Sequence, residues 1–149
     1  MYKNIGILSV ARTPIGSFGG SLKSLSTADL ATAAIKAAID RSGLSPADVD
    51  EVVMGCVGQY GNNAFLARLA ALNAGLPVET TAQTVNRMCA SGLQAIISAA
   101  DYITADGGSV AVAGGAESMS NYPFSLQNAR WGYRMGNDTL QDDLMTVLG

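Results

Sequence analysis

Residues 85–95, VNRMCASGLQA, decide how this chain folds. A strand-like run that ends near Asn86 gives way there to an alanine-rich helical pattern, and the thiol of Cys89 lies at the joint. A thiol at the first turn of a helix feels the partial positive charge of unpaired backbone N–H groups, which favours the thiolate and lowers the pKa of cysteine from about 8.5. The same N–H groups can hold a developing oxyanion. The pattern makes Cys89 a candidate nucleophile; the alternative is a buried, inert thiol, which is common for free cysteine.

Strand-like and helical runs alternate on both sides of this joint. Short apolar or β-branched runs predict strands at 5–10, 51–55, 81–86 and 109–113. Helical periodicity predicts helices between 26 and 43, at 63–74 and at 90–105, with a helical turn at 45–48. Strands that alternate with helices are typical of βαβ units. We therefore expect an α/β fold with a mainly parallel, four- or five-stranded sheet that helices cover on both faces.

The first expected helix has its own start and stop signals. Ser26 and Asp29, three residues apart, resemble a capping box, and Gly43 suits the left-handed position that ends a helix. An apolar stripe recurs at helical spacing and is expected to face inward: Leu30, Ala33, Ala34, Ala37 and Ala38.

Composition limits the possible partners. The chain has 149 residues, of which 48% are hydrophobic, with a net charge of −3 and a sequence pI of about 4.7. A chain of this length can bury one compact core. The acidic balance and the lack of Lys or Arg runs argue against nucleic acid and anionic membrane as partners. No apolar stretch reaches the roughly 18 residues of a membrane helix, and the run at 5–10 is too short for a secretory signal, so we expect a cytoplasmic protein.

The cysteine and histidine content narrows the chemistry. The chain has two cysteines, Cys56 and Cys89, and no histidine. A cytoplasmic setting favours two free thiols over a disulfide, and Cys56, which follows the strand-like run at 51–55, is expected to be structural. Without histidine or a Cys-x-x-Cys motif, we expect no metal site, no haem and no Cys-His pair formed within this chain.

Three motifs resemble segments of the thiolase family, which comprises the acetyl-CoA acetyltransferases and 3-ketoacyl-CoA thiolases. Residues 85–96, VNRMCASGLQAI, resemble the segment with the family's acyl-accepting cysteine. Residues 11–22, ARTPIGSFGGSL, resemble its opening, and residues 114–120, GGAESMS, resemble the segment that leads into its loop domain. The motifs stand in the family's order and spacing and cover essentially the whole chain, which is less than half of a typical member.

The resemblance implies a thiolase-like βαβαβ layered fold, N-terminal half only. Residues 1–117 would form the N-terminal α/β domain, and residues 118–149 the incomplete start of the loop domain. The latter residues lack a clear period, apart from a possible short helix near 138–148.

A mechanism and a set of partners follow from the same resemblance. Cys89 is the acyl-thioester nucleophile by motif match, with its own backbone N–H as one oxyanion donor. The substrates are acetyl-CoA or other acyl-CoA thioesters, with no tightly bound cofactor beyond coenzyme A as the carrier. An acyl-cysteine intermediate splits the formation or cleavage of acetoacetyl-CoA or a 3-ketoacyl-CoA into two easier steps. Family members are dimers or tetramers, so we expect a homo-oligomer or pairing with a complementary C-terminal half.

The family's proton carriers have no counterpart in these residues. They are a histidine in a Gly-His-Pro motif and a second cysteine in a Cys-x-Gly-Gly-Gly motif, whereas Cys56 lies in GCVGQ and matches a structural segment. We therefore expect the chain alone to be inactive. In the family the two halves pack through a shared helical layer, so the helix at 91–105 is expected to expose an apolar face in this chain; the alternative is that it covers only its own sheet. A fragment, a truncated product, one subunit of a split thiolase and a non-catalytic thiolase-fold interaction module remain open. A ketoacyl-carrier-protein synthase shares the fold, but the motifs at 11–16 and 114–120 favour a thiolase.

Several other residues have both a functional and a structural interpretation. Asn86 is expected to orient the turn before Cys89 by an Asx-type hydrogen bond. Glu117 could carry a proton or make a structural hydrogen bond. Other candidates are Met88 and Met119 for an acyl pocket or the core, and Arg12, Arg130 and Arg134 for CoA phosphates or the solvated surface. Residues 59–68, QYGNNAFLAR, depart from the family's pattern, which leaves the acyl-chain preference open.

Overall fold

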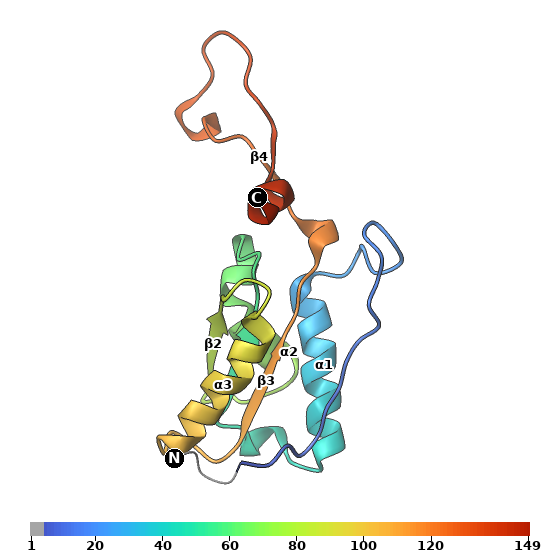
Figure 1. Cartoon of the computed structure of the whole chain (residues 1–149), viewed down its shortest axis with the longest axis vertical. Helices are drawn as coiled ribbons and strands as arrows, with labels where there is room; N and C mark the ends of the chain where they lie inside the picture. Colours follow the sequence, from blue (N-terminus) through green and yellow to red (C-terminus); the bar gives the residue numbers. More distant parts are fainter. Residues whose placement is uncertain (1–4) are drawn as a thin grey trace.

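The computed structural model describes residues 5–149. A parallel sheet of three strands, in the order β2-β1-β3, lies between helices (Figure 1). The strands are β1 (Glu51–Gly55), β2 (Thr81–Val85) and β3 (Ala111–Gly115). Helices α1 (Thr27–Ser42) and α2 (Leu66–Asn73) lie on one side of the sheet and α3 (Ser91–Thr104) on the other. This arrangement confirms the expected α/β fold with a parallel sheet between helices.

Strand β1 is the centre of the sheet and of the core. All of its residues are buried, and it pairs in parallel with both neighbouring strands. Val52 and Met54 belong to the core formed with α1 and α2, whereas Val53 packs with Ala95 and Ala99 of α3. A continuous apolar run is typical of a strand that is buried on both faces. The sheet therefore separates two cores, one on each side.

The expected strand at 5–10 is not part of the sheet, so the prediction of four or five strands is wrong. No strand pairing involves these residues within the described part of the chain, and Ile7 is 81% exposed. The segment lies beside α1, where the Ser9 hydroxyl donates to the Ala38 carbonyl at 2.6 Å. An apolar run becomes a strand only when its backbone pairs with another strand edge, and here the nearest partner is a helix.

Helix α1 begins and ends where its sequence predicts, but it turns a different face to the core. Ser26 caps its first turn through a capping box with Asp29, and Gly43 ends it with a φ of 76°. The predicted inner face is wrong, because Ala33 is exposed. The buried stripe is Thr27, Ala31, Ile35 and Ile39. The two isoleucines bury more apolar surface than alanines can, which favours this face.

Other boundaries move by a few residues. β3 begins two residues later than expected, because the N–H groups of Ser109 and Val110 donate to the Asp50 carboxylate at 2.8 and 3.1 Å and hold these residues in the preceding turn. The helix expected at 63–74 begins as a 3-10 turn and continues as α2. The 3-10 helices are η1 (Pro46–Asp48), η2 (Gly61–Phe65), η3 (Met119–Asn121) and η4 (Ala129–Trp131).

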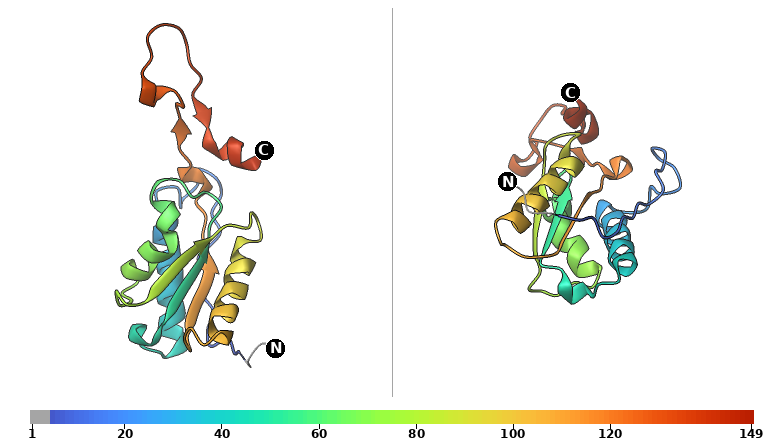
Figure 2. Two further views of the ribbon diagram at one scale, coloured as in Figure 1. Left: turned by 90° about the vertical axis from the view of Figure 1, so that its left-hand side faces the viewer. Right: turned by 60° about the horizontal axis from the view of Figure 1, so that its bottom comes forward.

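Residues 118–149 leave the layers beyond the end of β3 and project from them as an extension (Figures 1 and 2). The extension holds an antiparallel pair, β4 (Phe124–Ser125) with β5 (Gln141–Asp142), and the short helix α4 (Asp143–Leu148). Of the helix expected at 138–148, residues 143–148 are helical and form α4. The tip of the extension is exposed, with Met135 at 98%, so this segment adds little to the core.

Candidate active site

Cys89 lies in the turn that joins β2 to α3, as its sequence predicts. The turn spans residues 86–90, and the thiol is exposed. Met88 has a φ of 50°, in the left-handed region that residues other than glycine seldom adopt. Such a conformation costs free energy and persists only where the surroundings hold it in place. The backbone next to the thiol is therefore fixed by specific contacts.

Asn86 and Ser91 supply those contacts from the two ends of the turn. The side-chain oxygen of Asn86 accepts from the Met88 N–H at 3.0 Å, which is the expected Asx-type hydrogen bond. Ser91 is buried at the start of α3, where its hydroxyl accepts from the Arg87 N–H at 2.8 Å and donates to the Met88 carbonyl at 2.6 Å. The role of Ser91 was missed in the sequence, although a serine two residues after Cys89 is a recognisable turn signal.

Glycines let the start of α3 approach the sheet closely. A Cβ built on Gly55, the last residue of β1, would lie 2.4 Å from the Ser91 carbonyl carbon and 2.6 Å from the Gly92 nitrogen. A Cβ on Gly115, which pairs with Gly55 across β1 and β3, would lie 3.4 Å from the Gly92 Cα. The first turn of α3 therefore rests on backbone at the carboxyl end of the sheet. The sequence signal for this approach is a glycine that ends a buried strand.

The Cys89 turn and the first turn of α3 contain unpaired N–H groups. Among residues 5–149, the N–H groups of Cys89, Gly92 and Leu93 make no hydrogen bond within the chain, whereas those of Ala90 and Ser91 donate to carbonyls of the turn. The first N–H groups of a helix carry a partial positive charge. The turn can therefore offer hydrogen bonds to an oxygen that develops negative charge near Cys89.

Glu117 ties the loop after β1 to the end of β3. Its carboxylate accepts from the Val57 N–H at 2.8 Å and from the Gly58 N–H at 3.3 Å, and the Tyr122 hydroxyl donates to it at 3.3 Å. Main-chain donors thus occupy the carboxylate, which supports the structural interpretation of this residue rather than the proton carrier. The sequence alone gives no sign of this contact, because the partners lie about sixty positions apart.

Cys56 is buried beside the same carboxylate. Its sulfur lies 3.8 Å from Glu117 Oε1, and its exposed fraction is 1%. Burial, followed by the negative charge of Glu117, raises the pKa of the Cys56 thiol to about 12. Cys56 is therefore a neutral, enclosed thiol at neutral pH, in keeping with the expected structural role.

Tyr122 anchors the base of the extension to this loop. A Cβ on Gly58 would lie 2.2 Å from the Tyr122 hydroxyl oxygen, so the ring occupies the space that a side chain at 58 would need. The ring also packs against Tyr60, with centroids 4.8 Å apart. Burial and the charge of Glu117 raise the pKa of the Tyr122 hydroxyl well above its ordinary value. The Tyr122 hydroxyl is therefore a donor to Glu117 throughout the neutral range.

A cavity of about 360 Å³ lies between residues 11–18, α1 and residues 115–120. Arg12 and Met119 line it, whereas Cys89 does not. Met88 is 56% exposed next to Cys89, so the structure does not bring together the two methionines that were candidates for an acyl pocket or the core.

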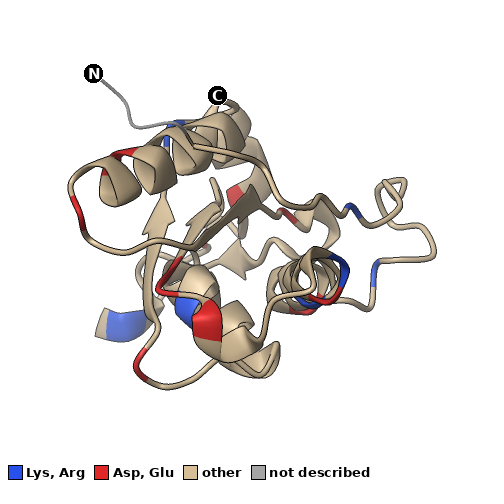
Figure 3. Ribbon diagram, turned by 90° about the horizontal axis from the view of Figure 1, so that it is seen from below, with Lys and Arg blue, Asp and Glu red and all other residues tan. Residues whose placement is uncertain are grey.

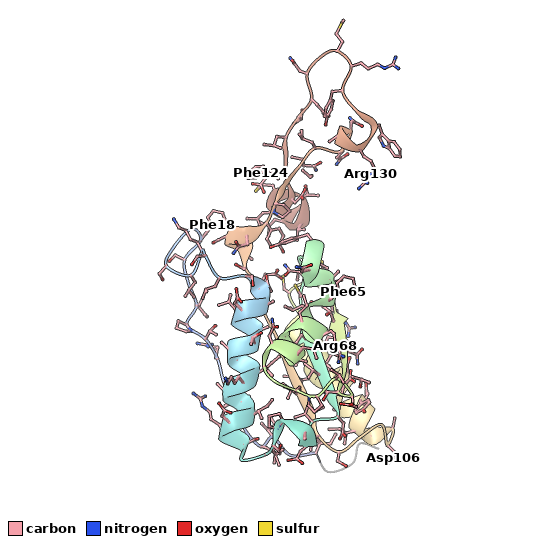
Figure 4. The ribbon with its side chains drawn as sticks, turned by 180° about the vertical axis from the view of Figure 1, so that it is seen from behind. Phe18, Phe65, Arg68, Asp106, Phe124 and Arg130 are labelled. Carbon is pink, nitrogen blue, oxygen red and sulfur yellow. The ribbon has the colours of Figure 1, made fainter. Side chains whose placement is uncertain are left out.

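The three arginines that were candidates for CoA phosphates or for the solvated surface, Arg12, Arg130 and Arg134, are dispersed. Arg130 and Arg134 are exposed in the extension, and Figure 4 shows Arg130 there. Acidic and basic residues are interspersed over the molecule in Figure 3. Within residues 5–149, no helix is long and apolar enough to span a bilayer, and no group of three or more His, Cys, Asp or Glu side chains is placed to hold a metal ion.

Helix α3 exposes apolar side chains on its outer face. Leu93, Ile96 and Ile97, at helical spacing, are 63%, 51% and 38% exposed. Its small residues Ala95 and Ala99 face the sheet. The expected apolar face on this helix is therefore present.

The family is clear from comparison with known proteins. The chain belongs to the thiolase family, because the model of the thiolase N-terminal domain matches residues 5–148.

Its relatives are acetyltransferases and thiolases of greater length. An acetyl-CoA acetyltransferase of Syntrophomonas wolfei is 44% identical over 135 residues, which are 91% of this chain and 34% of the relative. A cytosolic acetyl-CoA acetyltransferase of Gibberella zeae is 50% identical over 139 residues, 93% of this chain and 35% of the relative. A beta-ketothiolase of Cupriavidus necator is 44% identical over 149 residues, 99% of this chain and 38% of the relative.

A solved structure shares the fold. The acetyl-CoA acetyltransferase from Syntrophomonas wolfei matches with a TM-score of 0.86 and 38% identity, over 93% of this chain and 35% of that chain. The chain thus spans about a third of the length of the relatives it matches.

Proposed function

We propose that this chain is the N-terminal part of a thiolase-type acyl-CoA C-acetyltransferase, in which Cys89 carries the acyl group. The observation that supports this most directly is the exposed Cys89 thiol in a strained turn at the start of α3, held by Asn86 and Ser91. The relatives named acetyl-CoA acetyltransferase and beta-ketothiolase supply the substrate class, CoA thioesters.

The reaction follows from the chemistry of a thiolate. The sulfur of Cys89 attacks the carbonyl carbon of acetyl-CoA, and the carbonyl oxygen takes up negative charge. Collapse of this intermediate expels the CoA thiolate and leaves an acetyl thioester on Cys89. A second acetyl-CoA, deprotonated at its α-carbon, then attacks the acetyl carbon and releases Cys89, which gives acetoacetyl-CoA. The reverse sequence cleaves a 3-ketoacyl-CoA.

The unpaired N–H groups at the turn suit the first intermediate. The N–H of Cys89, with Gly92 and Leu93 beyond it, donates no hydrogen bond within the described chain and is free to meet the oxyanion. Removal of one such donor typically lowers turnover by about 10²- to 10³-fold. We propose the Cys89 N–H as one oxyanion donor.

The proton carriers are proposed to lie outside these residues. The sequence has no histidine, and Cys56 is buried against Glu117, where its thiol cannot reach a substrate. General acid–base catalysis contributes about 10²- to 10⁴-fold per step. We therefore propose that the chain alone does not turn over and that a complementary C-terminal half completes the site.

The domain limits and the assembly are part of the same proposal. Residues 1–117 would form the α/β domain and residues 118–149 the start of a loop domain, which is supported by the departure of the chain from the layers beyond β3. The apolar outer face of α3 supports association with a second copy or with the complementary half. The cytosolic relative supports a cytoplasmic location, and the family supports catalysis without a tightly bound cofactor.

A chimera tests the proposal. Residues 1–149 are joined to the remaining two thirds of the Syntrophomonas wolfei relative, and thiolysis of acetoacetyl-CoA is measured, with acid quenching and mass spectrometry to locate the acetyl group. We expect turnover by the chimera, acetyl on Cys89, and no turnover by the isolated chain or by the Cys89→Ser chimera. Cys56→Ala is the matched control and should stay active. An acetyl group on another residue, or full turnover with Cys89→Ser, contradicts the assignment.

The same chimera distinguishes the proposed acyltransferase from a second candidate function, a non-catalytic interaction module. The exposed apolar face of α3 favours this second candidate. A module of that kind would give a folded, assembled chimera that never carries acetyl on Cys89.

A further inference from the structure

A chain of hydrogen bonds leads from Glu117 to the turn that carries Cys89. The Glu117 carboxylate accepts from the Val57 N–H at 2.8 Å, and the carbonyl of Val57 accepts from the Asn86 side-chain amide at 3.1 Å. The side-chain oxygen of Asn86 in turn accepts from the Met88 N–H at 3.0 Å. Three segments that are distant in sequence, the loop after β1, the end of β3 and the Cys89 turn, are thereby joined.

Each link fixes the next one. Hydrogen bonds to a carboxylate are shorter and stronger than neutral ones, so Glu117 holds the peptides at 57 and 58 firmly. The Val57 carbonyl then has one position, and it orients the Asn86 amide group. Asn86 needs this orientation, because its oxygen must face the Met88 N–H while its nitrogen faces Val57.

Met88 is where such restraint is required. Its φ of 50° costs free energy, and Asn86 and Ser91 are the side chains that hold its N–H and its carbonyl. The support from Ser91 does not pass through Glu117, because the Ser91 hydroxyl belongs to α3 and is hydrogen-bonded to Arg87 and Met88. The turn therefore has one support that depends on Glu117 and one that does not.

We propose that Glu117 is a positioning residue for Cys89, which acts through the 57–58 backbone and Asn86 on the conformation of Met88. The inference rests on the proposed function for the role of Cys89 but not for the coupling itself. Glu117 makes no contact with Cys89 and is therefore not a catalytic residue.

Solvent exchange of single backbone N–H groups, followed by NMR on the 149-residue chain, tests the coupling. Glu117→Gln removes the charge and one acceptor while it keeps the shape. We expect exchange at Met88 to become about three- to tenfold faster, as for the loss of one hydrogen bond, and exchange at Arg87, which Ser91 holds, to stay unchanged. Tyr122→Phe is the matched control: it removes a donor to Glu117, leaves the Val57 bond, and should leave Met88 unchanged.

A double-mutant cycle distinguishes the route from general loosening. In an Asn86→Ala background, Glu117→Gln should have no further effect on Met88 exchange, whereas in a Ser91→Ala background its effect should persist. An undiminished effect in the Asn86→Ala background, an equal rise at Arg87, or no rise at Met88 would each overturn the proposal.

The coupling can also be measured by substituting Asn86, which keeps the proposal testable if Glu117→Gln does not fold. Coupling is reciprocal, so Asn86→Ala should speed exchange at Val57 by a similar factor, and unchanged exchange there would overturn the route. None of these measurements requires turnover. A chimera that never acetylates Cys89, with the coupling to Met88 intact, therefore contradicts the proposed function alone.

Discussion

Ser91 and Met88 are joined twice across the turn that carries Cys89, because the Met88 carbonyl accepts from both the N–H of Ser91 at 3.0 Å and its hydroxyl at 2.6 Å. One carbonyl thus receives two donors from the first residue of α3, and the hydroxyl also accepts from Arg87. This pair ties the Met88 carbonyl to the first residue of α3.

Ser91→Ala should therefore destabilise the chain by about 1–2 kcal/mol, because it removes two hydrogen bonds of a buried hydroxyl. Urea unfolding followed by circular dichroism measures the change. Ser98→Ala, on the same helix but half-buried, is the control and should change stability by less than about 0.5 kcal/mol. Equal effects of the two substitutions would mean that the Ser91 contacts contribute no more to the free energy of unfolding than those of Ser98.

Gly55→Ala should be more damaging than its size suggests. The new Cβ would meet the Ser91 carbonyl carbon at 2.4 Å, and both partners are backbone, so α3 must move away from the sheet. We expect a loss of about 3 kcal/mol or more, measured by thermal or urea unfolding.

The control for this substitution lies in the same contact. Gly92→Ala puts its Cβ into open space in the first turn of α3 and should be neutral or stabilise by up to about 1 kcal/mol. If the Gly55→Ala variant kept normal stability, the approach of α3 to β1 would be looser than described.

The two thiols should differ sharply in reactivity. Cys89 is exposed, whereas Cys56 is buried and has a pKa of about 12. Iodoacetamide at pH 7.5 should label Cys89 at least about tenfold faster than Cys56, as followed by peptide mass spectrometry. Labelling of both thiols at one rate would contradict the enclosure of Cys56, and unfolding in urea should abolish the difference.

The stability of the fold should decrease as the pH rises above 9, and Cys56 is the first group to contribute to this decrease. Its pKa is 9.0 as an ordinary thiol and about 12 in the folded chain, so the unfolded state loses the proton first. The stabilisation is complete below pH 9 and is lost as the pH rises towards 12. We expect the Cys56 contribution to the free energy of unfolding to drop by about 1 kcal/mol between pH 9 and pH 10. Tyr60 and Tyr122, whose pKa values are also raised above the ordinary 10.0, add a further drop as the pH approaches and passes 10. Cys56→Ala should lack the Cys56 share of this drop in the same titration and keep the share of the tyrosines.

The parts of the fold that local sequence specifies were predictable. The capping box at Ser26, the stop at Gly43 and the strand-to-helix joint at Cys89 depend on residues within a few positions of one another. The strand expected at 5–10 failed for the opposite reason. Its residues have the right type, but a strand also needs a partner edge, and the choice of partner is made elsewhere in the chain.

The same distinction between local contacts and contacts of distant segments applies to the candidate site. Cys89 and the Asx-type bond of Asn86 are local and could be inferred. The engagement of Glu117 by Val57 and the close approach of Gly55 to Ser91 could not, because each joins elements that only the folded sheet brings together. The inward face of α1 likewise depended on which side chains α2 and the sheet would accept.

The Tyr122 ring, which fills the space over Gly58, also restricts how this protein can change over generations. Any side chain at 58 would collide with the phenol, and the phenol oxygen lies 2.2 Å from the first atom that such a side chain would add. A larger residue at 58 therefore requires the aromatic ring at 122 to move or to be replaced, and its loss would release the base of the extension from the loop after β1. The two positions are thus expected to vary as a pair.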